Sequence, residues 1–226
     1  KASDGSVMLS LAHARIRTDR NFVLTWEAQA PDAVNVAAFK GTRADGTHLV
    51  AMLKAGETAT PSNQARELIL VADTSGSMKG RSLSQLKKGL AAALSGLGPR
   101  DRFNVIHFNS QSEMLFEKAQ PLTSQSLGIA LNYVAGLEAR GGTEALPALD
   151  AALTDADQKT DQRIRQIVFL TDGEIEGAAE FLGRIAERRG LSRLFTVGIG
   201  PNISTSVMRT AAEIGRGKFV HIESRS

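Results

Sequence analysis

Two apolar patterns alternate along the chain from residue 67 onward. Continuous apolar runs such as Leu68–Ala72 and Ile164–Leu170 predict strands that are covered on both faces. Between such runs, apolar residues recur at the three- and four-residue spacing of an amphipathic helix, first at Leu83, Leu86, Leu90, Leu94 and Leu97. This repeated strand–helix order predicts an α/β fold, with a doubly wound, mostly parallel sheet of about six strands flanked by helices on both faces.

The same patterns place the individual elements. We predict strands over 68–72, 103–108, 113–116, 164–170, 194–197 and 218–222. We predict helices over 83–97, 127–137, 146–153, 178–188 and 204–214, and Gly141-Gly142 is expected to stop the second of them. His107 falls inside a predicted strand, which favours a packed or hydrogen-bonded histidine over a metal ligand.

The first sixty residues follow a different pattern. Alternation over Phe22–Trp26 predicts a strand, and the runs Val34–Phe39 and His48–Leu53 flank the turn signal Asp45-Gly46, which predicts a hairpin. A polar stretch over 56–64 is typical of a connector. We therefore expect residues 1–62 to form a β-rich extension packed on a main domain of residues 63–226.

Composition excludes several kinds of chemistry. The chain has no cysteine, which excludes disulfides, thiolate metal sites and a cysteine nucleophile. Its net charge of +3 is spread along the chain, and it has one Trp and one Tyr, so nucleic-acid binding is not expected. The apolar runs are much shorter than a membrane span, so no membrane insertion of these residues is expected.

Oxygen-bearing side chains gather where ligands of open α/β sheets bind, at the carboxyl ends of strands. Asp73, Ser75 and Ser77 follow the first predicted strand of the main domain, and Asp172 follows strand 164–170. Thr143, in Gly141-Gly142-Thr143, opens a predicted helix. Two neighbouring carboxylates repel unless a cation or a shared proton separates them. Carboxylate and hydroxyl oxygens suit Mg²⁺, Ca²⁺ or Mn²⁺.

This three-part set resembles the metal-ion-dependent adhesion site of von Willebrand factor type A domains, over about residues 66–222. The resemblance implies the Rossmann-like fold of that family. It also implies that Ser75, Ser77 and Thr143 supply hydroxyl ligands, while Asp73 and Asp172 bind directly or through water. Mg²⁺ is the implied ion, with Ca²⁺ or Mn²⁺ as alternatives, and the remaining coordination position takes an exposed Asp or Glu of a protein partner.

A second resemblance concerns the segment before this domain. Asp19–Trp26 is similar to the lead-in of inter-alpha-trypsin inhibitor heavy chains and of bacterial sortase-target surface proteins, in both of which a VIT domain precedes it. We therefore expect cation-dependent adhesion at a bacterial cell surface, with the full-length protein secreted and anchored. The alternatives are an intracellular module that assists an ATPase-linked complex assembly, and a metal-dependent hydrolase.

Catalysis is not expected from the motifs present. Asp73-Thr74-Ser75-Gly76-Ser77 lacks the second acid of an aspartyl-phosphate hydrolase and the first glycine of a serine-hydrolase elbow. No Gly-x-x-x-x-Gly-Lys-Ser/Thr stretch is present for a P-loop. Each of the three segments taken alone is compatible with a polar turn or a helix cap, and their combination favours the metal site.

Overall fold

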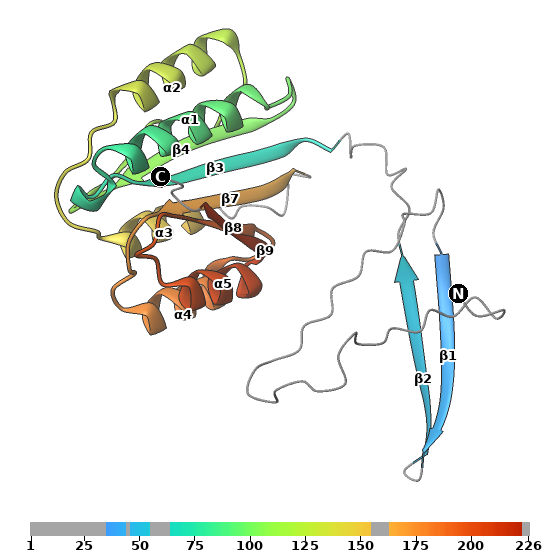
Figure 1. Ribbon diagram of the computed structural model, residues 1–226. Helices are drawn as coiled ribbons and strands as arrows, with labels where there is room; N and C mark the ends of the chain where they lie inside the picture. The colour runs from blue at the N-terminus through green and yellow to red at the C-terminus, as the bar shows by residue number, and fades with distance from the viewer. Residues whose placement is uncertain (1–34, 44–45, 55–63, 155–162, 223–226) are drawn as a thin grey trace, which may run out of the picture. The chain divides into compact units, whose positions relative to one another are not determined.

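The computed structural model describes residues 35–43, 46–54, 64–154 and 163–222 (Figure 1). The chain divides into two units, Lys1–Ser62 and Asn63–Ser226. In the first unit, β1 (Asn35–Arg43) and β2 (Gly46–Lys54) pair in antiparallel fashion, with Arg43 opposite Gly46. This is the hairpin that the turn signal predicts. The predicted strand Phe22–Trp26 lies outside the described residues, and the packing of the extension stays a prediction.

A mostly parallel sheet forms the centre of the second unit. Its order is β5-β4-β3-β7-β8-β9, and β4, β3, β7, β8 and β9 run parallel to one another. These strands are β3 (Arg66–Asp73), β4 (Arg102–Phe108), β7 (Ile164–Thr171), β8 (Arg193–Ile199) and β9 (Arg216–Ile222). The short β5 (Ser112–Met114) and β6 (Gln120–Pro121) both pair antiparallel with β4.

Helices cover both faces of this sheet (Figure 1). One face packs against α1 (Arg81–Ser95) and α2 (Ser124–Gly136). The other packs against α3 (Ala145–Thr154), α4 (Ala178–Arg188) and α5 (Thr205–Ile214). Alternate residues of β3 serve the two cores, because successive strand side chains point to opposite faces. The predicted doubly wound, Rossmann-like architecture is therefore confirmed.

Two local predictions differ from the structure. Helix α2 ends at Gly136, and Leu137 follows it with an extended backbone (φ −58°, ψ 136°) and a buried side chain. Gly141-Gly142 therefore does not stop the helix, and residues 137–144 form a loop between α2 and α3. Strand β6 was not predicted, because two residues that include Pro121 carry no periodic signal. Among the described helices, none combines the length and apolar character needed to cross a membrane.

Candidate metal centre

The candidate site lies where the order of strands reverses. Strand β3 pairs with β4 on one side and with β7 on the other. From β3 the chain first continues outward to β4 and later returns to the opposite side of β3 to form β7, so the direction of winding reverses at β3. Crevices at such switch points, outside the carboxyl ends of the strands, are where open α/β sheets bind ligands. Asp73 is the last residue of β3, and Asp172 directly follows β7. The topology thus brings both predicted carboxylates to the same point.

Four of the five predicted residues form one hydrogen-bonded cluster, which we call the carboxylate–hydroxyl cluster: Asp73, Ser75, Ser77 and Asp172. The Ser75 backbone N–H donates to Asp73 Oδ1 at 2.8 Å, and the Ser75 and Ser77 hydroxyl oxygens lie 2.9 Å apart. The Ser77 hydroxyl donates to Asp172 Oδ1 at 2.7 Å. Asp73, Ser75 and Asp172 are buried, whereas Ser77 is exposed, so the cluster reaches solvent at Ser77.

Packing beneath the first loop fixes its path. The backbone N–H and the hydroxyl of Thr74 both donate to the Phe108 carbonyl, at 2.7 and 3.0 Å. The loop then enters the short 3₁₀ helix η1 (Gly76–Met78), whose Met78 side chain is fully buried against the α1 side of the sheet. Thr74 and Met78 therefore pack the loop, which leaves the oxygen atoms of its Asp and Ser side chains facing the switch point.

The loop of residues 137–144, which carries Thr143, is hydrogen-bonded to the first loop. Arg140 N–H donates to the Thr74 carbonyl at 2.9 Å, and Gly76 N–H donates to the Gly141 carbonyl at 3.0 Å. Thr143 itself is partly buried, and within the described residues its hydroxyl makes no hydrogen bond. The structure thus places the backbone near Thr143 against the cluster without joining its hydroxyl to it.

The conformation of this loop requires glycine at one position. Gly141 has φ +74°, and a Cβ built there would lie 2.7 Å from Ser110 Oγ. A residue with a side chain would be strained by the left-handed backbone and would clash with Ser110, so glycine is required here. The same Ser110 oxygen accepts a hydrogen bond from Gly142 N–H at 2.8 Å. Ser110 and Gly141 together therefore hold the loop in the form that presents Thr143.

Thr171 is a functional candidate that the sequence analysis missed. Its hydroxyl donates to Asp73 Oδ2 at 2.5 Å and accepts from Gly173 N–H at 3.1 Å. The register of β3 against β7 identifies Thr171, because the pairing of Ala72 with Leu170 brings the next residues, Asp73 and Thr171, side by side. Thr171 and the Ser75 N–H each hold one oxygen of the Asp73 carboxylate, which fixes its orientation.

The electrostatics of the cluster favour a bound cation. Burial raises the pKa of Asp73, because the charged form loses hydration; hydrogen bonds from Ser75 and Thr171 oppose this, and the nearby Asp172 charge adds to it. A divalent cation offsets both the desolvation and the repulsion of the two carboxylates. The donors are hard oxygens, which fits Mg²⁺, Ca²⁺ or Mn²⁺. In the residues with described side chains, no group of three or more His, Cys, Asp or Glu is placed to hold a metal ion, and the candidate cluster itself combines two carboxylates with hydroxyls.

A hollow of about 620 Å³ opens beside the cluster. Ser77 and Asp172 line one part of it, and the other lining residues include Glu174 and the segment from Gly200 to Ile203, between β8 and α5. The exposed end of the carboxylate–hydroxyl cluster is therefore also the part that an incoming group can reach.

Comparison with known proteins agrees with this architecture. Residues 66–221 match the family model described as the von Willebrand factor type A domain. The chain is 30% identical over 166 residues to a von Willebrand factor A domain-containing protein of Dictyostelium discoideum, in an alignment that covers 73% of this chain and 18% of that protein. It is 28% identical over 185 residues to human inter-alpha-trypsin inhibitor heavy chain H4, covering 76% of this chain and 19% of that one.

The chain thus spans about a fifth of the length of these two relatives. Among solved structures, a von Willebrand factor type A protein from Catenulispora acidiphila aligns with a TM-score of 0.67 at 21% identity, over 91% of this chain and 49% of that chain. At that identity, the likeness shows the fold.

Proposed function

The chain belongs to the von Willebrand factor type A domain family, and from this premise we propose that it binds an acidic protein partner through a divalent cation held by five of its residues. Domains of this family generally take part in metal-dependent protein–protein interactions. The proposed ligands are Asp73, Ser75, Ser77, Thr143 and Asp172. The observation that carries the proposal is the carboxylate–hydroxyl cluster, in which four of these residues already touch one another at the switch point of the sheet.

The small number of charged ligands explains why the partner should be acidic. Only two of the five proposed ligands are charged and three are neutral hydroxyls, so the ion stays electrophilic and its open coordination position favours a further anionic ligand. A bound Mg²⁺, or Ca²⁺ or Mn²⁺ in its place, supplies the positive charge that a carboxylate of the partner binds. Thr171 and the Ser75 N–H keep the Asp73 carboxylate oriented, and the hollow beside Ser77 and Asp172 admits the incoming side chain.

We propose binding without catalysis. The two histidines within residues 64–222 hydrogen-bond to groups outside the cluster, His107 to Tyr133 and His221 to the Gly200 carbonyl. Neither is therefore placed to act as a general base there. For the setting we propose a bacterial cell surface, which is supported by the similarity of residues 19–26 to the lead-in of bacterial sortase-target surface proteins.

Calorimetric titration with Mg²⁺ tests the centre directly. We expect Asp73→Ala and Asp172→Ala each to abolish binding while circular dichroism shows a retained fold. Glu174→Gln is the matched control, because Glu174 lines the hollow beside Asp172 without belonging to the cluster. This variant should still bind Mg²⁺. Parallel titrations with Ca²⁺, Mn²⁺ and Zn²⁺ identify the preferred ion. Unchanged Mg²⁺ binding in both Ala variants would show that the five residues are not the metal ligands.

A further inference from the structure

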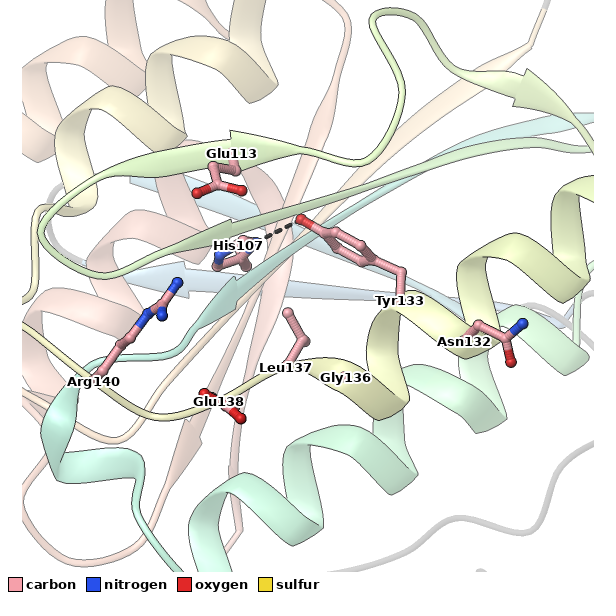
Figure 2. A pocket seen from close by; sticks show the side chains of 8 residues that line it. All are labelled: His107, Glu113, Asn132, Tyr133, Gly136, Leu137, Glu138 and Arg140. Atoms are coloured by element: carbon pink, nitrogen blue, oxygen red, sulfur yellow. Dashed lines mark hydrogen bonds between the residues drawn. The ribbon is translucent and has the colours of Figure 1, made fainter.

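A second hollow lies outside the five proposed metal ligands (Figure 2). It has a volume of about 240 Å³, and its charged and aromatic lining comes from four separate segments. Figure 2 shows His107 of β4, Glu113 of β5 and Tyr133 of α2 around it, with Glu138 and Arg140 contributed by the 137–144 loop. We call it the edge hollow, because β4 and β5 form the edge of the sheet at this end.

The floor of the edge hollow is a neutral aromatic pair. His107 Nδ1 and the Tyr133 hydroxyl lie 2.6 Å apart, and the two rings are 5.6 Å apart at an angle of 60°. Burial lowers the pKa of His107, an effect that Glu113 opposes and Arg140 reinforces. Burial also raises the pKa of Tyr133 to about 12, with Glu113 adding to the rise. Both side chains are therefore uncharged at neutral pH, so neither repels a cation, and a phenol ring such as that of Tyr133 can attract one.

The rim of the edge hollow carries an excess of negative charge. Glu113 and Glu138 are exposed carboxylates, and Arg140 is the single guanidinium among the lining residues. With the floor neutral, the hollow holds one net negative charge, which favours a cationic group over an anionic one. Its volume equals that of about eight water molecules at ~30 Å³ each. That is smaller than the ~300–1,000 Å³ of typical small-molecule sites, and it suits one long side chain.

We propose that the edge hollow receives a single arginine or lysine side chain of the protein that binds at the metal centre. The identity of the donor rests on the function proposed above, whereas the preference for a cation rests on the hollow alone. The 137–144 loop joins the two sites, since Arg140 and Gly141 hydrogen-bond to the Asp73–Ser77 loop while Glu138 and Arg140 form part of the hollow. A partner that engages both sites would have to present an acidic residue to the metal centre and a basic residue to the edge hollow.

The test uses two small probes that differ in charge. N-acetyl-arginine amide carries one guanidinium, and N-acetyl-citrulline amide has the same shape without the charge. Each is titrated into the isotopically labelled full chain in EDTA and again in Mg²⁺, and amide and ring resonances are followed by NMR. We expect the arginine probe to shift resonances of His107 and Tyr133 in a saturable way at millimolar concentration with or without Mg²⁺, and the citrulline probe to leave them unchanged.

Variants of the charged rim residues test whether the hollow prefers a positive charge. Glu113→Gln and Glu138→Gln should each weaken binding of the arginine probe by about 1.4- to 5-fold, the range expected for exposed ion pairs. Arg140→Gln should strengthen it, because the repelling charge is gone. Glu117→Gln is the matched control, since Glu117 is an exposed carboxylate after β5 that does not line the hollow, and it should leave binding unchanged.

Each outcome separates this inference from the proposed function. Equal shifts with both probes, no shift with either, or weaker arginine binding in Arg140→Gln would overturn the cation assignment. A chain that binds Mg²⁺ but not the arginine probe refutes the inference and leaves the metal centre standing. A chain that binds the arginine probe but not Mg²⁺ refutes the metal centre and removes the partner role, while the hollow remains a cation site.

Discussion

Replacing Thr171 by Val tests whether the Asp73 carboxylate must be held in place to bind a metal. Valine has nearly the same shape as threonine, so the change removes the hydroxyl with little change in packed volume. Asp73 Oδ2 then loses the hydrogen bond donated at 2.5 Å, and Gly173 N–H loses its acceptor at 3.1 Å. The other carboxylate oxygen keeps its hydrogen bond from Ser75 N–H.

The size of the effect follows from these contacts. A hydrogen bond to a charged group contributes about 1.5–3 kcal/mol to folding. Because Gly173 N–H is also left without its acceptor, we expect the free energy of unfolding to fall by about 2–3 kcal/mol. Side chains that orient metal ligands usually change metal affinity by about 10- to 100-fold. We therefore expect the Mg²⁺ dissociation constant of Thr171→Val to rise by about 10- to 100-fold.

The assay pairs urea unfolding without metal with Mg²⁺ titration calorimetry, and Thr196→Val provides the matched control. Thr196 is as fully buried as Thr171, but its hydroxyl donates to the Met208 carbonyl at 2.8 Å, away from the cluster. That neutral bond contributes about 0.5–1.5 kcal/mol, so the control should lose some stability and keep its Mg²⁺ affinity. If Thr171→Val bound Mg²⁺ as tightly as the wild type, the orienting role of Thr171 would be refuted.

Three further predictions concern stability. Burial raises the pKa of Asp101, yet hydrogen bonds from Arg66 hold that pKa below its usual value. Asp101→Asn should therefore lower the free energy of unfolding at pH 7, measured in urea, by about 1–3 kcal/mol. This difference from the wild type should disappear as the pH falls through the lowered pKa, because the wild-type carboxyl is then protonated. An unchanged loss at low pH would contradict it. Gly141→Ala should cost about 1–2 kcal/mol from its left-handed backbone alone, plus the clash with Ser110, and should weaken Mg²⁺ binding; an equally stable variant would refute that conformation. A Cβ added at Gly183 in α4 meets no atom within 4 Å, and alanine is a better helix former than glycine. Gly183→Ala should therefore stabilise the protein by about 0.5–1 kcal/mol and raise its thermal midpoint, and a lower midpoint would contradict this.

Much of the fold could be predicted because its signals are local. The leucine stripe of α1 and the apolar run of β3 each specify an element without reference to the rest of the chain. The apolar spacing placed the end of α2 within one residue of Gly136, but the stop assigned to Gly141-Gly142 was wrong, because the chain already leaves the helix at Leu137, whose side chain is buried. Strand β6 depends on pairing with β4 and has no pattern of its own.

The candidate site divides along the same line. Asp73, Ser75, Ser77 and Asp172 were predicted from residue type and from their positions after strands, and the structure brings them into one cluster. The roles of other residues depend on which atoms meet across the sheet. Thr171 acts through the register of β3 and β7, and the edge hollow combines four segments whose residues carry no shared motif. Of that hollow, the sequence predicted only that His107 would be packed or hydrogen-bonded, which is confirmed.

The pairing of β3 with β7 also sets when the carboxylate–hydroxyl cluster can form during synthesis of the chain. The hydrogen bonds that complete the cluster join residues 98 positions apart for Asp73 and Thr171, and 95 apart for Ser77 and Asp172. A ribosome that adds about 5–20 residues per second needs roughly 5–20 s to make that intervening stretch. The first loop therefore leaves the ribosome well before its partners exist. Capture of the proposed cation would consequently be a late step, one that follows pairing of the central strands and does not guide the earlier stages of folding.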